Sequence, residues 1–286
     1  MSEKVAAVVV TYNRLELLKK VIDGLRNQTH KLDKIIVVNN ASTDGTSQWL
    51  SSQDDLEIIN QDNLGSSGGQ YSGSVFAYQN GYDWIWQMDD DVVADKYCLE
   101  NLFKFADENL VVVPKRIAAN GEVFYNDTKV LNMTNPFKSI WSSIVSEKDF
   151  ENKELIYAEG ITYEGPLFHK SVFKRVGFAE KKFFIIGDDT EYAIRLKNYF
   201  IKSAIVNSAV FYRQLPVAEN GYKFDWKTYH VIKNLIAMDV LHGSFWVRWF
   251  RPFGYTLTWL TRCKNFNDVK TVLKALKDAY FYKSDN

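Results

Sequence analysis

Residues 5–14 read Val5-Ala6-Ala7-Val8-Val9-Val10-Thr11-Tyr12-Asn13-Arg14, an apolar run that ends in a polar cluster. The segment after it, Leu15 to Leu25, has helical periodicity, and Lys34 to Val38 is apolar again. Continuous apolar runs of this length are typical of buried strands, and a helix between two of them is typical of a β-α-β unit. The sequence therefore predicts that a parallel sheet begins here.

The same alternation continues toward the middle of the chain. A helix is expected from the capping segment Ser42-Thr43-Asp44, and further strands are expected at Leu56 to Asn60, Trp84 to Met88 and Val111 to Pro114. Strands that are apolar throughout belong to sheets covered on both faces. We expect an α/β fold with a mostly parallel central sheet flanked by helices.

Polar clusters stand where these predicted strands end. They are Thr11 to Arg14, Asn39 to Asp44, Asn63 to Gly69 and Asp89 to Asp91. In open α/β sheets, ligands bind outside the carboxyl ends of the strands. The four clusters therefore indicate one binding site.

The pattern changes after residue 120. Residues 120–154 show no sustained period and predict a hairpin or a mobile loop. Order returns with residues 163–177 and 183–199. In the second of these, Gly187-Asp188-Asp189 opens a helix whose Glu191 and Arg195 are expected to form an ordinary surface pair. Beyond Phe211 the chain is rich in aromatic and basic residues.

Composition excludes several classes of protein. The 286 residues are 46% apolar, and 35 Lys+Arg against 35 Asp+Glu give no net charge. Disorder is excluded, and the strongly basic field of a nucleic-acid binder is missing. Two cysteines and an apolar run at 5–10 too short for a signal peptide favour the cytosol. No stretch is long and apolar enough to span a membrane, so membrane contact would be peripheral.

Asp89, Asp90 and Asp91 repel one another unless a cation or hydrogen-bond donors compensate their charge. Alternation along an extended chain puts Asp89 and Asp91 on one side and Asp90 on the other. The outer pair could therefore share one Mg²⁺ or Mn²⁺ ion, for which oxygen ligands are suited. The alternative is a solvated acidic turn.

Two further segments could carry chemistry. Asn63-Leu64-Gly65-Ser66-Ser67-Gly68-Gly69 leads into a helix whose free N–H groups could approach an anion, or it is a plain flexible loop. Asp188 and Asp189 lie at a helix N-terminus, where the macrodipole favours the carboxylate form. Asp189 could then be a general base, while helix capping would account for one of the two without chemistry.

Taken together, these motifs resemble the family-2 inverting glycosyltransferases. The resemblance rests on Val8 to Arg14, Asn40 to Thr46, Asp89-Asp90-Asp91 and Asp188-Asp189 ahead of Glu191, and it covers about the first 200 residues. It implies a GT-A fold, a nucleotide-sugar donor and a divalent metal, Mn²⁺ or Mg²⁺. Asn63 to Gly69 and Met88 to Val92 are most similar to the bacterial galactofuranosyltransferase branch of this family.

The resemblance also implies roles for particular residues. The catalytic base would be Asp189, and the metal ligands would be Asp89 and Asp91. The donor-binding residues would be Thr11, Tyr12, Asn13, Arg14, Asn39, Asn63, Gly68, Gly69, Asp89 and Asp90. The acceptor-binding residues would be Glu164, Gly165, Asp188 and Trp141, although for Trp141 the residue type alone favours a buried aromatic side chain.

Two positions depart from the family pattern. Many members have Asp where this chain has Asn39, whose carbonyl can still accept a hydrogen bond from a pyrimidine base. The family often supplies a histidine metal ligand where this chain reads Val210-Phe211-Tyr212-Arg213. Either the aspartates, diphosphate and water hold the metal alone, or Arg213 partly neutralises the leaving diphosphate.

The expected function is transfer of a sugar from a UDP-sugar, with UDP-galactofuranose favoured, to a hydroxyl of a glycan or lipid-linked glycan in cell-surface polysaccharide such as capsule or O-antigen. The alternatives are a rhamnosyltransferase that uses dTDP-rhamnose and an inactive nucleotide-sugar-binding scaffold. A homo-oligomer is compatible with the sequence, and a nucleic-acid partner is not expected.

Three parts are expected along the chain. A nucleotide-binding half at about 1–115 and an acceptor half at about 116–215 make up the catalytic domain, and 216–286 form a helical extension. Within the extension, Phe245 to Arg262 mixes aromatic and basic residues. That mixture suits either a membrane interface or a helix packed on the rest of the protein.

Overall fold

The protein is described by a computed structural model over residues 3–216 and 224–284. The strands in this part are β1 (Val5–Thr11), β2 (Lys34–Asn40), β3 (Leu56–Gln61), β4 (Trp84–Asp89), β5 (Val92–Ala94), β6 (Val111–Ile117), β7 (Thr128–Leu131), β8 (Trp141–Ile144), β9 (Leu155–Ala158), β10 (Leu167–His169) and β11 (Ser203–Arg213). The α-helices are α1 (Leu15–Arg26), α2 (Thr46–Ser51), α3 (Gly65–Gln79), α4 (Cys98–Phe103), α5 (Lys170–Val176), α6 (Asp188–Asn198), α7 (Trp226–His242), α8 (Phe245–Leu260) and α9 (Phe266–Tyr280). Two 3-10 turns are η1 (Glu147–Phe150) and η2 (Lys181–Phe183).

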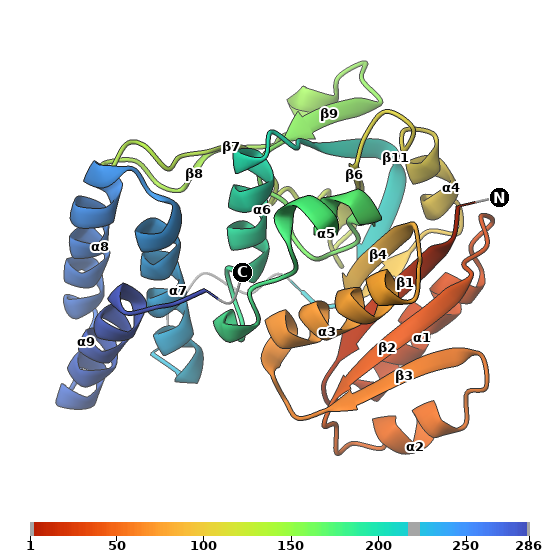
Figure 1. Cartoon of the computed structure of the whole chain (residues 1–286), viewed down its shortest axis with the longest axis horizontal. Helices are drawn as coiled ribbons and strands as arrows, with labels where there is room; N and C mark the ends of the chain where they lie inside the picture. Colours follow the sequence, from red (N-terminus) through yellow and green to blue (C-terminus); the bar gives the residue numbers. More distant parts are fainter. Residues whose placement is uncertain (1–2, 217–223, 285–286) are drawn as a thin grey trace.

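A central sheet with the strand order β3-β2-β1-β4-β10-β6-β11-β5 runs through the protein, and β9 pairs with β11 (Figure 1). The neighbours β3, β2, β1 and β4 are parallel, as the repeated strand-helix pattern predicts. The expected α/β class, with helices around the sheet and at the C-terminal end, is confirmed.

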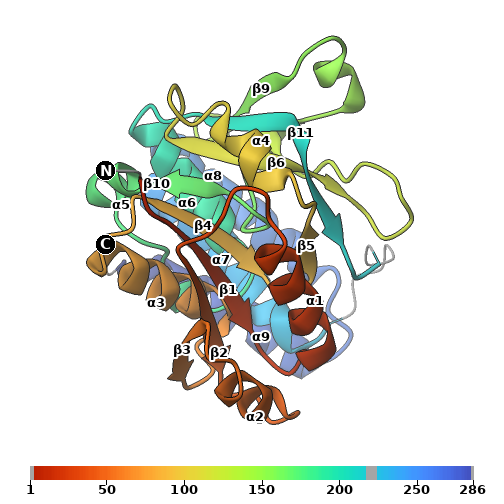
Figure 2. The ribbon, with the colours of Figure 1, turned by 90° about the vertical axis from the view of Figure 1, so that its right-hand side faces the viewer.

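Alternation along β1 builds a core on each face of the sheet. Val5, Ala7 and Val9 pack with the apolar face of α1, while the alternate residues of the strand pack on the side of α3. Figure 2 shows α1 and α3 on opposite sides of β1. Because both faces are covered, the open place for a ligand is at the strand ends.

The second half of the sheet is mixed. β10 runs antiparallel between β4 and β6, β6 and β11 are parallel, and β5 and β9 pair antiparallel with β11. β5 and β10 are three residues long, too short to show a period in the sequence.

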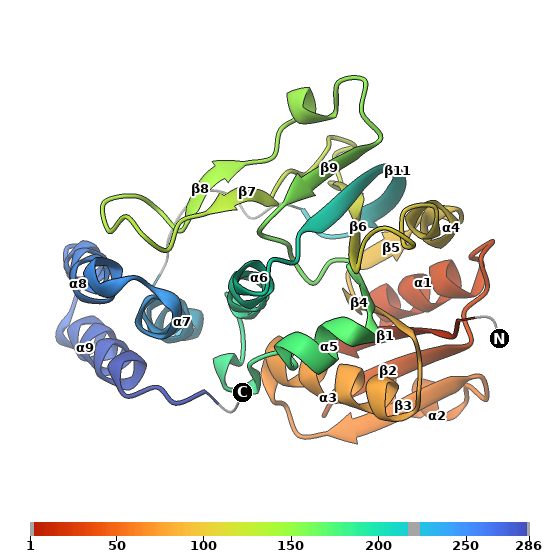
Figure 3. The same ribbon diagram turned by 45° about the horizontal axis from the view of Figure 1, so that its top comes forward.

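The weakly patterned segment contains a hairpin, one of the two expected alternatives. β7 and β8 pair antiparallel in a sheet of their own. In Figure 3 this hairpin reaches from the region of β9 across to α8. The helices α7, α8 and α9 pack against one another, and α7 also contacts α6. No helix in the described part of the chain has the length and apolar character needed to cross a bilayer.

Candidate active site

A cavity of about 930 Å³ opens at the carboxyl ends of β1 and β4. It is closed on the other sides by the start of α6, by the β7–β8 hairpin and by α7. The sequence-predicted residues that line it are Thr11, Tyr12, Arg14, Asn63, Asp89, Asp90, Asp91, Trp141, Glu164, Asp188 and Asp189. Segments almost 180 positions apart in the chain thus meet at one site.

Asp90 and Asp91 lie in the turn between β4 and β5 and both contact Arg14, so the expected alternation, with Asp90 on the side opposite Asp91, does not hold. Asp90 contacts the end of β1. One of its carboxylate oxygens accepts hydrogen bonds from Thr11 Oγ1 at 2.8 Å and from the Tyr12 backbone N–H at 3.3 Å. Arg14 Nη1 lies 3.0 Å from an oxygen of Asp90 and 3.0 Å from an oxygen of Asp91. These bonds fix the strand end, and Arg14 offsets part of the negative charge there.

Arg14 contacts Asp91 as well as Asp90, so the carboxylate that most needs compensation is that of Asp89. Burial and the neighbouring charges of Asp91 and Asp90 raise the pKa of Asp89 well above its ordinary value. Asp89 accepts from Gln70 Nε2 at 3.2 Å, which is an uncharged donor. A cation between Asp89 and Asp91 would relieve this repulsion, so the oxygen-only donor set fits Mn²⁺ or Mg²⁺.

The protein offers few ligands beyond these two aspartates. Among residues 3–216 and 224–284, no group of three or more His, Cys, Asp and Glu side chains is placed to hold a metal. Arg213, which stands where the family often has histidine, instead pairs with Glu164. A bound metal would therefore need further oxygen ligands from a substrate and from water.

Asp188 and Asp189 begin α6, as the sequence predicts, after Gly187 with its positive φ of 87°. Burial raises the pKa of Asp188 to about 8 and that of Asp189 to about 6. Desolvation, the largest cause of both shifts, opposes the effect expected from the helix macrodipole. At neutral pH Asp189 is ionised, whereas Asp188 keeps its proton.

Glu164 lies between two arginines from different strands. Arg213 Nε is 3.1 Å from one oxygen of Glu164, and Arg116 Nη1 is 3.3 Å from the other. The Arg213 guanidinium also lies over the ring of Phe124, 4.0 Å from its centroid. Arg116 in turn pairs with the buried Asp127. This cluster adds fixed charges to the cavity wall beside Asp189.

Arg116 and Asp127 were not predicted from the sequence. Arg116 is 1% exposed although it is a charged residue in a strand. The sequence offered only a charged residue after the apolar run of β6 as a sign of this cluster. The partner, Asp127, lies in the segment 120–154, which has no sustained pattern.

Asn13 and Asn39, two of the residues expected to bind the sugar donor, are not part of the cavity lining. Asn39 uses its amide group internally: Nδ2 donates to Ser47 Oγ and Asn60 Oδ1, and Oδ1 accepts from the Ser42 N–H. Asn13 Oδ1 accepts from the Thr43 N–H at 2.6 Å. Both side chains brace the loops after β1 and β2.

Three expected glycines also lie outside the cavity lining. Gly68 and Gly69 are inside α3, and a Cβ on Gly69 would stand 2.3 Å from Val10 Cγ1. Gly165 accepts a hydrogen bond from Trp86 Nε1 through its carbonyl. These glycines let the helix and the loop approach the sheet closely. Gly65 and Ser66, at the start of α3, line the cavity instead.

The loop before α6, residues 183–187, forms a wall that was not predicted. Phe184 and Ile186 have positive φ values of 67° and 65°. Asn234 Nδ2, from α7, lies 2.7 to 3.0 Å from the carbonyl oxygens of Phe183, Ile185 and Ile186. α7 thereby holds the backbone that leads directly to Asp189.

The Glu191 and Arg195 pair is buried, so the expectation of an ordinary surface pair is wrong. Arg195 Nη2 is 2.9 Å from Glu191, and the exposed fractions of the two residues are 8% and 1%. Arg195 also donates to the carbonyls of Val176 and Phe178, and His242 Nε2 lies 2.9 Å from Glu191. The pair lies inside because it joins α6 to the end of α5 and to α7.

Fold and site together define the class of protein as an α/β protein of the GT-A fold with an aspartate-lined cavity at the strand ends. Residues 6–177 match the family described as Glycosyl transferase family 2. The chain belongs to glycosyl transferase family 2. The expected similarity to its galactofuranosyltransferases is confirmed by the relatives below.

Galactofuranosyltransferase GlfT1 of Mycobacterium tuberculosis is 31% identical over 202 residues, which cover 68% of this chain and 65% of that protein. GlfT1 of Mycolicibacterium smegmatis is 29% identical and covers 68% of this chain and 66% of its own length. This chain thus spans just under two thirds of either relative. O-antigen chain rhamnosyltransferase RfbN of Salmonella typhimurium is 26% identical over 82% of this chain and 75% of its own.

A solved structure shares the fold. The crystal structure of GalNAc-T7 with UDP, GalNAc and Mn²⁺ superposes with a TM-score of 0.65 over 97% of this chain and 54% of that chain. At 10% sequence identity, the likeness concerns the fold alone.

Proposed function

We propose that this chain is an inverting glycosyltransferase that moves a sugar from a UDP-sugar to a hydroxyl of a glycan or lipid-linked glycan acceptor. The observation that carries the proposal is that one cavity holds the Asp89-Asp90-Asp91 cluster and Asp189, from β4 and α6. The first group suits a nucleotide diphosphate with its cation, and the second suits proton abstraction. The family match and the galactofuranosyltransferase relatives support this assignment.

The reaction we propose is a single displacement. Asp189 accepts the proton of the acceptor hydroxyl, whose oxygen forms a bond to the anomeric carbon of the donor sugar. The bond from that carbon to the diphosphate oxygen breaks, and the nucleoside diphosphate leaves with the electron pair, which inverts the carbon. Asp189 suits the role of base because it is ionised at neutral pH but retains a raised pKa of about 6.

Asp89 and Asp91 would hold a divalent cation, which when bound supplies Lewis-acid stabilisation of the departing diphosphate. Arg14 keeps the strand end in place through Asp90 and Asp91. Thr11, Tyr12 and Asn63 line the donor side in this proposal, and Trp141 and Glu164 line the acceptor side. Asn13, Asn39, Gly68, Gly69 and Gly165 would act by supporting these walls.

UDP-galactofuranose is the favoured donor, because galactofuranosyltransferases are among the relatives. A rhamnosyltransferase that uses dTDP-rhamnose is the second candidate, and the similarity to RfbN supports it. We also propose that the product belongs to cell-surface polysaccharide, and that the catalytic domain ends near residue 215, before the helical extension. An inactive sugar-nucleotide scaffold would keep the fold but lose turnover.

Calorimetric titration with UDP tests the donor site. We expect binding with Mn²⁺ present, loss of most of the affinity in EDTA, and loss of metal-dependent binding in Asp91→Ala. Asp107→Ala, at an exposed aspartate outside the cavity, is the matched control and should bind as the unaltered protein does. Absence of UDP binding in either condition would contradict the UDP donor, and tighter binding of dTDP would favour rhamnose.

Turnover is tested separately from binding. Release of UDP from UDP-galactofuranose, with water or an added glycan as acceptor, separates an enzyme from a scaffold. If the protein binds UDP with Mn²⁺ but releases no UDP from any UDP-sugar, it acts as a nucleotide-sugar-binding scaffold and not as an enzyme.

A further inference from the structure

One side of helix α8 is apolar and exposed, although the apolar side of a helix in a water-soluble protein normally packs on the core. The exposed fractions are 59% for Trp246, 52% for Trp249, 51% for Phe250, 62% for Phe253 and 66% for Leu257. The spacing of these positions, i, i+3, i+4, i+7 and i+11, places them on one side of the helix. Contiguous exposed apolar surface of this kind marks an interaction site.

The tip of the β7–β8 hairpin extends this face. Phe137 is 88% exposed. Thr134, Asn135, Pro136 and Phe137 line an open hollow of about 520 Å³ together with Trp246 and Phe250 of α8. Residues more than 100 positions apart thus form one surface, which we call the aromatic face: residues 134–137 with the exposed side of α8.

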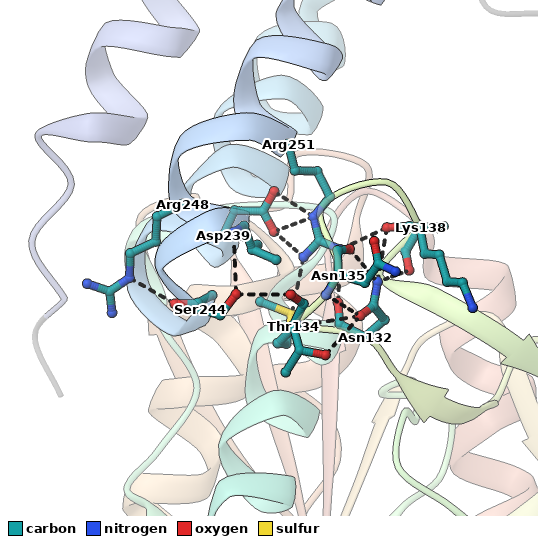
Figure 4. A network of polar contacts seen from close by, with 12 residues as sticks. Asn132, Thr134, Asn135, Lys138, Asp239, Ser244, Arg248 and Arg251 are labelled. Carbon is teal, nitrogen blue, oxygen red and sulfur yellow. Dashed lines mark hydrogen bonds and ion pairs between the residues drawn. The ribbon is translucent and has the colours of Figure 1, made fainter.

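A buried polar network fixes the two parts of the aromatic face to each other. The Arg251 guanidinium binds Asp239 of α7, with Nη2 2.6 Å from the carboxylate, and both side chains are at most 3% exposed. Its Nη1 donates to the carbonyls of Asn132 and Lys138, at the two ends of the hairpin tip. Figure 4 shows Arg251 and Asp239 at the centre of these contacts.

Ser244, which caps α8, adds two bonds to the hairpin tip. Its N–H donates to the Met133 carbonyl at 2.8 Å, and its Oγ donates to the Thr134 carbonyl at 3.1 Å. The inner side of α8 is therefore held by polar contacts while its outer side is aromatic. Within residues 3–216 and 224–284, the aromatic and leucine side chains of the outer side remain more than half exposed.

Positive charge predominates in the segments that form the aromatic face. Neither residues 128–146 nor residues 240–267 contain an Asp or Glu, although both contain Lys or Arg. Residues 224–284 hold 10 Lys+Arg and 4 Asp+Glu, a net charge of +6 in a chain whose total is zero. Tryptophan and phenylalanine flanked by arginine and lysine suit the headgroup level of an anionic bilayer.

We propose that the aromatic face docks on an anionic lipid surface, with α8 lying in the interface plane and Phe137 inserted beside it. The docking is independent of the catalytic proposal. Its consequence for the acceptor rests on that proposal: Thr128, Trp141 and Ile144 of the same hairpin line the cavity. A lipid-linked acceptor would then reach the cavity along the hairpin.

Vesicle flotation tests the docking. The unaltered protein should float with phosphatidylcholine vesicles that contain about a third phosphatidylglycerol, float less with pure phosphatidylcholine, and lose binding at high salt. Phe137→Ser should weaken the partition coefficient at least tenfold, a change of about 1.4 kcal/mol or more, because it removes a large apolar side chain from the interface. Trp246→Ser combined with Phe250→Ser should abolish flotation.

Phe200→Ser is the matched control, since Phe200 is 95% exposed between α6 and β11 and is outside the aromatic face. It should float as the unaltered protein does. No flotation with anionic vesicles, or equal losses in Phe137→Ser and Phe200→Ser, would overturn the proposal. A concentration-dependent dimer that Phe137→Ser dissociates would also overturn it and assign the face to a second copy of the chain.

UDP titration of the same variants keeps the two proposals apart. Variants that bind UDP normally but do not float are folded and support the docking. Flotation without any UDP binding would leave the docking in place and contradict the donor site.

Discussion

Asp188 and Asp189 are adjacent in the chain, and burial raises the pKa of both, to about 8 and about 6. The charge of Asp189 raises the pKa of Asp188 further, and hydrogen bonds from Thr190 lower that of Asp189. Asp188 Oδ2 is buried without a hydrogen-bond partner in the described part of the protein. Asp189 accepts from the Thr190 N–H at 2.6 Å, which favours its ionised form. Two carboxyl groups with separated proton affinities can take different roles, one as a base and the other as a hydrogen-bond donor.

The pH dependence of transfer follows from this difference. Because the base must be deprotonated and its pKa is raised to about 6, kcat/KM should rise through about pH 6 and level off above about pH 7. At pH 5 the rate should be about a tenth of the plateau. Asp189→Asn should abolish transfer while UDP affinity stays within about twofold, because the change removes only the base.

Asp188→Asn is the control for this prediction. Asparagine resembles the protonated form that Asp188 already has at neutral pH, so the inflection near pH 6 should persist. A flat profile between pH 5 and pH 7, or turnover retained in Asp189→Asn, would assign the base elsewhere.

The sequence indicated Asp89, Asp91 and Asp189 because each stands at a predictable boundary, a strand end or a helix start. The charged cluster around Glu164 was not predictable in the same way. Arg116 and Arg213 come from β6 and β11, Asp127 from the irregular segment between, and only the folded sheet brings them together. The raised pKa values of Asp188 and Asp189 could not be predicted from the sequence, since desolvation depends on tertiary burial.

The element that most directly supports the site is the loop 183–187. Gly65 packs against it so closely that a Cβ there would stand 1.9 Å from the Phe184 carbonyl oxygen. On its other side, Asn234 donates to the loop's carbonyls, and the residue is 1% exposed. Phe184 and Ile186, on either side of Ile185, both have positive φ, a strained conformation that the contacts from Gly65 and Asn234 hold in place.

Asn234→Ala should therefore loosen this loop. Carbonyls left unpaired in a buried place cost on the order of 1–3 kcal/mol, so the free energy of unfolding should fall by about 2 kcal/mol. Amide hydrogen exchange should accelerate at residues 184–188 more than elsewhere. Urea denaturation and exchange measured by mass spectrometry check both effects without any assay of activity.

Asn80→Ala is a suitable comparison, because Asn80 is exposed and its side chain donates only to the Phe76 carbonyl at the end of α3. Its effect should stay below about 0.5 kcal/mol. Unchanged exchange at residues 184–188 in Asn234→Ala would show that α7 does not hold the loop.

Elements differ in how far the sequence predicts them. β1 to β4 and α1 were predicted to within a few residues, because each has a long and unbroken period. β10 pairs antiparallel with β4, and β5 pairs antiparallel with β11, in a sheet whose sequence pattern is that of β-α-β units. Both strands are too short to show a hydrophobic period in the sequence. For the segment 120–154, the sequence left a hairpin and a mobile loop open, since its pairing has two register shifts.

At the scale of the whole molecule, three long helices complete a cavity that the sheet begins. α7 contributes Trp226, Asn234 and Met238 to the cavity wall, and its Asp239 binds Arg251 of α8. Burial raises the pKa of Asp239 to about 6. The Arg251 guanidinium links the hairpin, α7 and α8, and Ser244 adds two further bonds between α8 and the hairpin.

Arg251→Met should destabilise the protein by about 3–5 kcal/mol, because it leaves the carboxylate of Asp239 buried and unpaired. Arg248→Met is the matched control three residues earlier. Arg248 is exposed and donates only to carbonyls at the end of α7 and at Gly243, so about 1 kcal/mol is expected. Chemical denaturation of both variants checks the difference, and equal losses would contradict a central role for Arg251.

The strands of the β7–β8 hairpin line the cavity, and the tip of the hairpin is part of the aromatic face. Any ligand that stabilises one arrangement of this hairpin alters the free energy of binding at its other end. Thermodynamic reciprocity then requires that if a bilayer tightens acceptor binding by some factor, acceptor tightens bilayer binding by the same factor. The protein would thus dwell longest on those membranes that already carry its acceptor, without any separate targeting signal.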